Sequence, residues 1–291
     1  MKHPYILFIC LMICMSAEAG NIKKDSLAFV NAGWEVIKLQ GGATAMSAEI
    51  RMFDSQQSIS ILKYPAGRFS TRLIHSPGDM AGKTSVIGSR EGAMMGINGG
   101  YFDMKKLIPC VYFRIGDEIF SQTAPSETFR VNGVIGTKDR KGRKVMIASC
   151  GPEEYEDIAG RWHSVMASGP MLVDEGRILV PEYDETDGSG KGTDSFSDVR
   201  HPRSIIGYDD KGNIYLMVID GRHPGKGDGM SIYETALTCR FLGMQDAINL
   251  DGGGSSSLWH EELGVLSHPS DNKTFDHKGE RAIPNIIGIY R

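Results

Sequence analysis

Two aspartates, each followed by glycine, are the residues best suited to chemistry. Asp220 is followed by Gly221 and Arg222, and Asp251 is followed by three consecutive glycines. Paired carboxylates can act as general acid, general base or nucleophile. Consecutive glycines leave main-chain N–H groups unshielded, which makes an anion-binding nest. The two motifs therefore predict an acidic site beside a loop that can hold an anion.

A predicted β-hairpin leads into the first aspartate. Apolar runs at 203–208 and 214–219 are joined by a polar turn that contains glycine, which is a hairpin signature. Pairing the end of the first run with the start of the second places Arg203 opposite Ile219, next to Asp220. A slip of one residue would turn each side chain to the other face, so the pattern predicts proximity only.

A helix and a short strand connect the hairpin to the second aspartate. Ser231 with Glu234 three residues later is a capping box, and Gly243 supplies the left-handed exit of the helix. Residues 247–250 have the pattern of a short buried strand. Strand, helix and strand over about 214–250 form a βαβ unit, whose strands run parallel and end at the same sheet edge.

This sheet edge is the predicted catalytic site, because α/β sheets tend to bind ligands where their strands end. Asp220, Asp251 and Arg203 are expected to converge there. Glu234 is a fourth catalytic candidate with two open interpretations, since helix capping alone explains a glutamate at this position. Any one of these motifs also fits a turn or a surface ion pair. Convergence of several motifs on one edge favours a site.

Further polar residues beside glycine supply candidate substrate contacts. A buried strand over 94–97 ends in a polar residue, bare main chain and an aromatic wall suited to a sugar or a base, and 167–170 repeats the theme. The candidate substrate-binding residues are Asn98, Gly99, Gly100, Tyr101, Ser168, Gly169, Arg222, Gly252, Gly253, Gly254 and Ser255.

Strand signals dominate the rest of the chain, and helical periodicity is clear only in the segment after Ser231. We therefore predict an α+β fold with strand-rich mixed sheets, few helices and one βαβ unit at about 214–250. Short β-rich runs bounded by turn residues occupy 34–39, 48–53, 111–115, 144–148 and 283–290.

The first nineteen residues have the features of a secretory signal peptide. Lys2 supplies the positive start, residues 5–15 are apolar, and small residues precede a cleavage site after Ala19. The apolar run is too short to span a membrane. We expect an exported protein, periplasmic or extracellular, with no membrane span after cleavage. Residues 20–291 are expected to form a single domain.

Composition narrows the class of partner. The chain carries 32 Lys and Arg against 36 Asp and Glu, and this weakly acidic balance argues against a nucleic-acid binder, which needs a basic face. The hydrophobic share of 41% is ordinary for a globular protein.

Three cysteines follow the signal peptide, so at most one internal bridge can form among Cys110, Cys150 and Cys239. Their wide spacing fits no zinc site, and burial as small hydrophobes is the simpler interpretation.

Seven motifs, taken in their order along the chain, resemble the phosphodiester glycosidase family over about residues 90–291. The two most specific are His-Pro-Arg at 201–203 and Asn-Leu-Asp-Gly-Gly-Gly-Ser at 249–255. Departures at Ser204, Tyr101 and the single glycine before Pro170 leave the charged positions untouched. The motifs are Asn98 to Asp103, Ser168 to Val173, His201 to Gly207, Val218 to Arg222, Ser231 to Glu234, Asn249 to Ser256 and Arg281 to Asn285.

The resemblance implies hydrolysis of a sugar-1-phosphodiester, of the α-N-acetylglucosamine-1-phosphate type, to free sugar and a phosphomonoester. Arg203 is suited to clamp phosphate oxygens with two parallel hydrogen bonds. The amides of 252–254 and Ser255 would hold the remaining oxygens as charge develops. Asp220 or Asp251 would act as base or nucleophile, and the sequence does not choose between them. No cofactor is required, and a divalent cation on these carboxylates is neither demanded nor excluded by the spacing.

Two alternatives from other classes stay open. A serine esterase with Ser255 or Ser256 as nucleophile needs a positioned histidine, and none of the eight histidines lies in a recognisable nucleophile-elbow context. A non-catalytic module of the cell envelope would bind a glycan or sugar phosphate without turnover.

Overall fold

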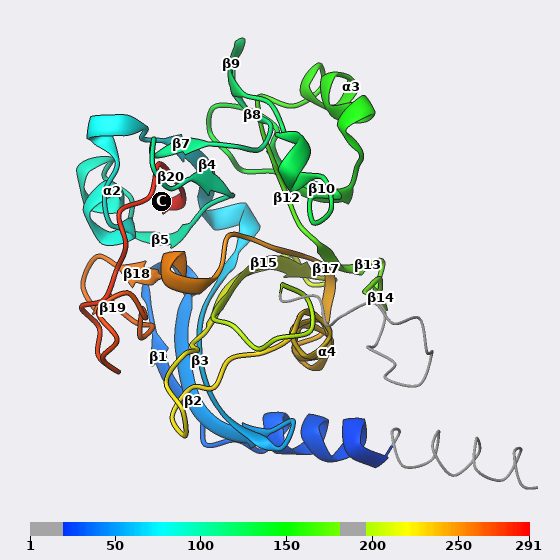
Figure 1. The fold of residues 1–291 in the computed structure, drawn as a ribbon, viewed down its shortest axis with the longest axis vertical. Coiled ribbons are helices and arrows are strands. Elements are labelled where there is room, and N and C mark those ends of the chain that lie inside the picture. Colours follow the sequence, from blue (N-terminus) through cyan, green and yellow to red (C-terminus); the bar gives the residue numbers. More distant parts are fainter. Residues whose placement is uncertain (1–19, 181–195) are drawn as a thin grey trace, which may run out of the picture.

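Three antiparallel sheets build the protein, as the computed structural model of residues 20–180 and 196–291 shows (Figure 1). The predicted signal peptide, residues 1–19, lies outside the described residues. The prediction of a strand-rich fold with few helices is confirmed, and each of the five β-rich runs predicted outside the site overlaps an observed strand. The predicted mixed sheets are wrong, because neighbouring strands pair antiparallel throughout the described residues.

The largest sheet has eight strands in the order β1-β2-β3-β16-β15-β17-β13-β14. The strands are β1 (Glu35–Lys38), β2 (Thr44–Met52), β3 (Ser55–Pro65), β16 (Asn213–Ile219), β15 (Arg203–Asp209), β17 (Met244–Asn249), β13 (Met171–Asp174) and β14 (Arg177–Ile178). This sheet contains every strand that leads into a predicted catalytic residue.

Two five-stranded sheets and a two-stranded ribbon, β6 (Phe102–Asp103) with β7 (Ile108–Pro109), complete the β structure. The second sheet comprises β11 (Val145–Ser149), β10 (Gly133–Thr137), β12 (Ser164–Ser168), β8 (Phe113–Ile115) and β9 (Glu118–Ser121). The third comprises β19 (Gly264–Val265), β18 (Leu258–His260), β5 (Met95–Asn98), β20 (Asn285–Tyr290) and β4 (Ser70–His75).

The helices are short and pack on the outside of the sheets (Figure 1). They are a helix over 20–30, α2 (Thr84–Arg90), α3 (Tyr155–Ala159) and α4 (Ile232–Phe241). Helix α4 covers one face of the eight-stranded sheet, with buried Ile232, Ala236 and Cys239 in a core that includes Ile205 and Met217. The other face packs against the two smaller sheets through residues such as Val218, Ile248 and Val134.

The predicted hairpin has the predicted register, with Arg203 opposite Ile219. Strands β16 and β17 are not hydrogen-bonded to each other, because β15 lies between them and pairs antiparallel with both. They therefore point in the same direction and end at the same edge. There the main chain is packed so closely that a Cβ added to Gly221 would lie 2.5 Å from the Pro202 nitrogen, and one added to Gly252 would lie 2.7 Å from its oxygen.

The predicted limits of α4 are confirmed. The Ser231 hydroxyl accepts a hydrogen bond from the Glu234 amide at 3.1 Å, and the Glu234 carboxylate accepts one from the Ser231 amide at 2.9 Å. Gly243 follows the helix with φ of +80°. The three cysteines are free thiols, and Cys150 and Cys239 are buried as expected of small hydrophobes.

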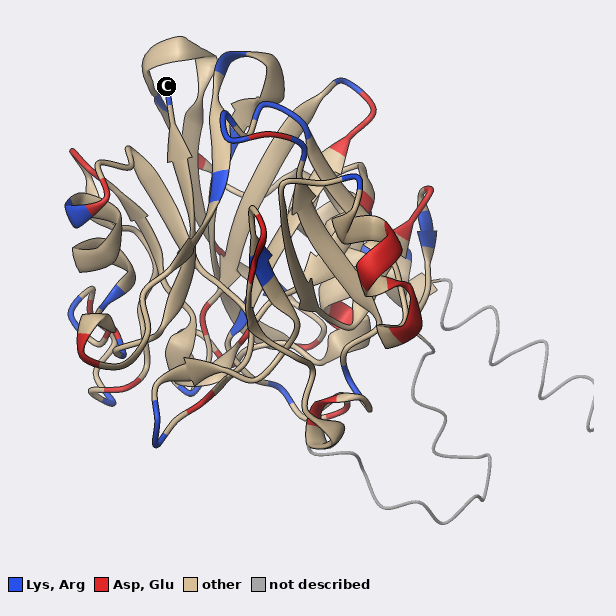
Figure 2. Ribbon diagram, turned by 90° about the horizontal axis from the view of Figure 1, so that it is seen from above, with Lys and Arg blue, Asp and Glu red and all other residues tan. Residues whose placement is uncertain are grey.

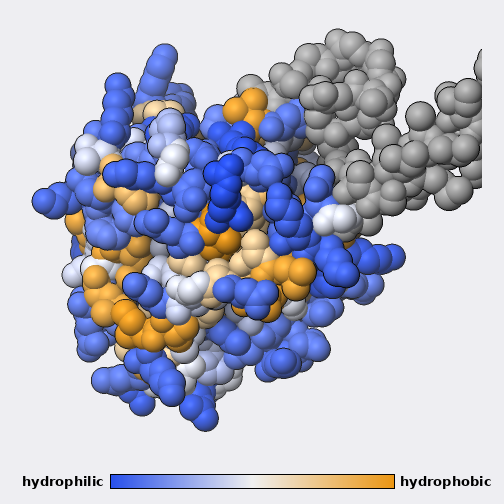
Figure 3. Space-filling model, turned by 90° about the horizontal axis from the view of Figure 1, so that it is seen from below, coloured by the Kyte–Doolittle hydropathy of each residue, from blue (hydrophilic) through white to orange (hydrophobic). Residues whose placement is uncertain are grey.

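Lys and Arg are interspersed with Asp and Glu (Figure 2), and on the face seen from below apolar residues gather in several patches surrounded by hydrophilic ones (Figure 3). Across the described ranges, every helix falls short of the length and apolarity that crossing a membrane requires.

Candidate functional site

Asp251 lies in the turn after β17 and is held there through its main chain. Its amide donates to the Gly99 carbonyl at 3.0 Å, and its carbonyl accepts from Asn98 Nδ2 at 2.6 Å. Neither of these hydrogen bonds uses the Asp251 carboxyl group. Burial raises the pKa of Asp251 to about 6, although the Ser255 side chain and the positive charges of Arg130 and Arg281 lower it.

The glycine triplet after Asp251 lies against two guanidinium groups. A Cβ on Gly253 would lie 2.8 Å from Nη2 of Arg222, and a Cβ on Gly254 would collide with Arg281. Only glycine allows the main chain to approach these cations so closely. The predicted anion-binding loop therefore has cationic side chains beside its amides, which strengthens its suitability for a phosphate.

A third guanidinium, that of Arg130, stacks on Tyr101. The guanidinium carbon lies 3.8 Å from the ring centroid, and Nε of Arg130 is hydrogen-bonded to Glu127 at 2.8 Å. The buried Tyr101 hydroxyl donates to the Gly169 carbonyl at 2.6 Å and accepts from Asn249 Nδ2 at 3.0 Å. Burial raises the pKa of Tyr101, so the ring stays neutral. Tyr101 thus serves as a rigid wall behind Arg130.

Several predicted substrate contacts act as braces for the Asp251 turn. The buried Asn98 side chain accepts from the Ser204 hydroxyl at 2.7 Å as well as donating to Asp251. The Gly100 amide donates to Asn285 Oδ1 at 2.6 Å. These contacts hold the turn in place, and a direct contact of Asn98, Gly99 or Gly100 with substrate stays a prediction.

The motif at 168–169 braces the end of β17 in the same way. Ser168 Oγ donates to the Asn249 carbonyl at 2.7 Å, and the Gly169 amide also donates to that carbonyl at 3.1 Å. A Cβ on Gly169 would collide with the Arg130 carbonyl. The motif therefore ties the second sheet to the large one, next to Arg130.

Arg203 occupies a different place from the expected phosphate clamp. Its side chain is buried, with 2% exposed, and Nε donates to the Met230 carbonyl at 2.9 Å. Its Nη2 donates to the carbonyls of Phe196 and Val199 at 2.7 and 3.1 Å. Nε and Nη2 of Arg203 therefore face main-chain carbonyls. We revise its expected role from clamping phosphate to bracing the segment before β15.

Glu234 is accounted for by the helix cap and an ion pair. Besides capping α4, its carboxylate accepts from Nη2 of Arg200 at 2.6 Å and from Nε at 3.0 and 3.2 Å. Both carboxylate oxygens are engaged away from Asp251. Of the two interpretations left open by the sequence, the structural one is the better supported, and we no longer assign Glu234 a catalytic role.

Asp220 faces away from Arg203 although the strand ends meet as expected. Arg203 pairs with Ile219, and Ile205 pairs with Asn249. Directly paired residues share a face and neighbours along a strand alternate. Asp220, one residue beyond Ile219, therefore turns to the opposite face.

A histidine is the chief partner of Asp220. Its Oδ2 is 2.8 Å from Nδ1 of His268 and accepts from the Ser58 hydroxyl at 2.7 Å, while Oδ1 accepts from the His268 amide at 2.7 Å. Sequence reasoning missed this histidine, because nothing in its neighbourhood forms a recognised motif. It also missed Arg130, while Arg281 lay within a motif but was given no role.

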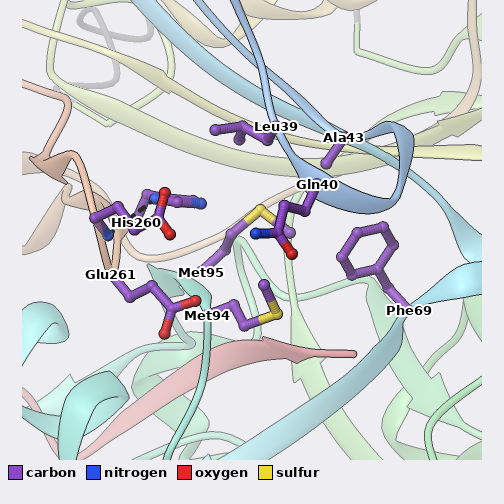
Figure 4. Close-up of a pocket in the computed structure, with 9 residues that line it drawn as sticks. Leu39, Gln40, Ala43, Phe69, Met94, Met95, His260 and Glu261 are labelled. Carbon is purple, nitrogen blue, oxygen red and sulfur yellow. Dashed lines mark hydrogen bonds between the residues drawn. The ribbon is translucent and has the colours of Figure 1, made fainter.

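No metal centre is found within residues 20–180 and 196–291, where no three His, Cys, Asp or Glu side chains gather closely enough to hold an ion. A cavity of about 50 Å³ lies between η1 (Gln40–Gly42), β4, β5 and β18, lined in part by Met94, Met95 and His260 (Figure 4). It is far below the roughly 300 Å³ or more of a ligand pocket. None of the predicted site residues lines it.

A family model described as phosphodiester glycosidase matches residues 91–290. Human N-acetylglucosamine-1-phosphodiester alpha-N-acetylglucosaminidase is 30% identical over 183 residues, which are 60% of this chain and 33% of that protein. The mouse protein of the same name is 28% identical over 138 residues, 46% of this chain and 26% of that one. The chain therefore spans about a quarter to a third of the length of these curated relatives.

A solved structure of the zebrafish protein of that name, described as a catalytic domain auto-inhibited by pro-peptide, superposes with a TM-score of 0.61. It is 20% identical, and the match covers 90% of this chain and 82% of that one. A hypothetical protein from Synechocystis superposes with a TM-score of 0.64 at 17% identity, covering 89% of this chain and 64% of that one. At these identities the likeness shows a shared fold.

Proposed function

Since the chain belongs to the phosphodiester glycosidase family, we propose that it hydrolyses a sugar-1-phosphodiester, of the α-N-acetylglucosamine-1-phosphate type, to free sugar and a phosphomonoester. The curated relatives are named for that substrate class. The observation that carries the proposal is the pairing of a carboxyl group of raised pKa with three guanidiniums at one glycine-rich turn.

The phosphate is placed at the glycine triplet. Arg222 lies directly against Gly253, and Arg281 with its partner Asp271 lies against Gly254, so an anion there meets two guanidinium groups. Guanidiniums bind phosphate oxygens with paired, charge-assisted hydrogen bonds. Arg281 is held by two hydrogen bonds to Asp271, at 2.6 and 3.0 Å, so its position is fixed before the substrate arrives. Such fixed donors stabilise negative charge as it develops on the leaving phosphate.

Asp251 exchanges a proton with the leaving phosphate. Cleavage of the bond between the anomeric carbon and oxygen leaves a phosphomonoester, whose second pKa is about 6. The pKa of Asp251 is raised to about 6, so a proton passes between the two groups with little change in free energy. This assigns Asp251 as acid on the phosphate side, one of the roles that the sequence alone left unassigned.

The test is release of sugar by the purified protein. We expect free N-acetylglucosamine from an α-N-acetylglucosamine-1-phosphodiester, with and without a chelator, and a loss of about 10²-fold or more in kcat for Asp251→Asn. Asp210→Asn is the matched control, because Asp210 is exposed at the tip of the β15–β16 hairpin. Absence of release across a panel of sugar-1-phosphodiesters by folded protein contradicts the proposal.

We also propose that the protein is exported, with cleavage after Ala19, on the strength of the signal-peptide pattern alone.

Of the alternative functions, the serine esterase loses support because no histidine is hydrogen-bonded to Ser255 within the part of the chain that the structure describes. The sugar-release assay distinguishes a non-catalytic binding module from the proposed enzyme, since such a module would bind the substrate without releasing sugar.

A further inference from the structure

Asp220 and His268 form a buried acid–histidine pair that the proposed function has not used. Asp220 is 1% exposed and receives three hydrogen bonds, two of them from His268. Because a carboxylate only accepts hydrogen bonds, Nδ1 of His268 carries the proton in this contact. The other ring nitrogen, Nε2, then presents a lone pair on a side chain that is 20% exposed. This arrangement fixes the tautomer and the direction of a proton acceptor.

Aromatic packing holds the ring of His268 in that orientation. It stacks on Phe275 with ring centroids 3.8 Å apart and planes inclined by 9°, and His277 packs at 4.4 Å. His223 lies against Phe275 at 5.3 Å, is 7% exposed, and has a buried Nε2 without a hydrogen-bond partner among the described residues. A buried polar atom normally has a partner. Nε2 of His223 therefore offers a further hydrogen-bonding position beside His268.

Short stretches of chain connect this pair to the glycine triplet. Arg222 follows Asp220 by two residues, and its positive φ of +65° turns the chain so that its guanidinium lies at Gly253. Asp271 follows His268 by three residues and, with Arg281, lies against Gly254. Three residues span at most about 11 Å. These two short connections place His268 on the chain segments that also build the predicted phosphate site.

Building on the proposed function, we propose that His268, positioned by Asp220, is the general base of the hydrolysis. Nε2 of His268 takes a proton from a water as the water oxygen bonds to the anomeric carbon. The bond from that carbon to the phosphate oxygen breaks, and its electron pair leaves with the phosphomonoester. The proton on His268 then passes to solvent, and Asp220 stabilises the imidazolium while it exists. Water is the only co-reactant.

The charged and titratable groups around His268 favour this role. Asp220 faces it from the end of β16, His223 lies beside it in the following turn with Lys226 close to His223, and His277 packs on it from its own loop. Burial lowers the pKa of His223, and the positive charge of Lys226 lowers it further, against the effect of Asp220. His223 therefore stays neutral and does not repel a proton arriving at His268.

The experiment compares His268→Gln and His268→Ala with His163→Gln, on the full chain with the substrate of the sugar-release assay. Glutamine keeps a donor for Asp220 but cannot accept a proton. His163 is the matched control, because its hydrogen bonds use its main chain, in the second sheet. We expect both His268 variants to lose about 10²-fold or more in kcat at nearly unchanged KM, with loss of the acidic limb of the pH profile. Added imidazole should restore part of the rate to His268→Ala alone.

The outcomes separate this inference from the proposed function. Wild-type protein that is inactive on every sugar-1-phosphodiester overturns both. Active wild type with a folded His268→Gln within about threefold of its kcat, and with the same pH profile, overturns the role of His268 alone. A rate loss without imidazole rescue and without change in the pH profile assigns the pair a structural role and likewise overturns the inference.

Discussion

At the scale of single residues, the site depends on a carboxyl group whose acidity is set by its surroundings. Asp251 is poorly solvated, and the cations beside it offset only part of that cost, so its pKa is raised to about 6. A half-buried carboxyl of raised pKa is typical of catalytic positions, where stability is given up for reactivity. The consequence is measurable in the folding equilibrium as well as in catalysis.

Stability should fall as the pH rises through the range between the unfolded and folded pKa of Asp251. The native state holds a proton up to about pH 6 that the unfolded chain releases near pH 4, so unfolding becomes easier between these values. The Asp251→Asn substitution removes this pH dependence of stability. Allowing for solvent screening, we expect the variant to be more stable than wild type at pH 7 by about 1–2 kcal/mol. Urea denaturation of both proteins at several pH values measures the difference. Parallel pH profiles would contradict the raised pKa.

Arg203→Lys should act on stability first. The arginine serves three main-chain carbonyls, and a lysine cannot reach all of them from one nitrogen. Buried carbonyls left unpaired cost about 1–3 kcal/mol each, so we expect a loss of about 2–4 kcal/mol in the free energy of unfolding. Denaturant titration measures it. Unchanged stability with a selective rise in KM would instead restore the phosphate-clamp interpretation.

At the scale of elements, what could be predicted was local in sequence. The turn between β15 and β16 fixes their register, and the capping box fixes the start of α4, so both were predicted correctly. The face of Asp220 stayed open because the sequence allowed a one-residue slip, and its partner Ser58 comes from β3, which is more than 140 residues earlier. His268 and Arg130 were missed for the same reason, because their partners are brought together by tertiary packing.

The cap of α4 offers a test of the assignment of Glu234. Glu234→Gln keeps the reciprocal cap but loses the ion pair with Arg200, and Ser231→Ala loses the hydroxyl cap. We expect each to lower stability by about 1 kcal/mol and to leave kcat nearly unchanged. Thermal unfolding and the sugar-release assay give the two readouts. A large loss of kcat in a stable Glu234→Gln protein would return Glu234 to the catalytic set.

At the scale of the whole molecule, the segment that matches the family does not contain the complete fold. Strand β3 pairs with β16 along its length, β4 pairs with β20, and Ser58 donates to Asp220. Residues 20–90 therefore supply strands to two of the sheets. They also supply Ser58, which hydrogen-bonds to Asp220, one of the two acidic residues of the proposed site. This supports the expectation that residues 20–291 fold as a single unit.

Removal of the first ninety residues should prevent folding. A protein of residues 91–291 exposes the edges of β16 and β20 and the apolar faces that β3 and β4 cover. We expect it to be insoluble or to lack a cooperative thermal transition, while residues 20–291 unfold in one step. A soluble and cooperative 91–291 protein would contradict the single-unit description.

The central claim is that the sugar–oxygen bond of a phosphodiester is the one that breaks, with the phosphate held at the glycine triplet after Asp251. Hydrolysis in ¹⁸O-labelled water tests it most directly, with the phosphomonoester product weighed by mass spectrometry. Attack of water at the anomeric carbon leaves the phosphomonoester unlabelled, which is the predicted result. Label in the phosphomonoester would show attack at phosphorus and would contradict the account.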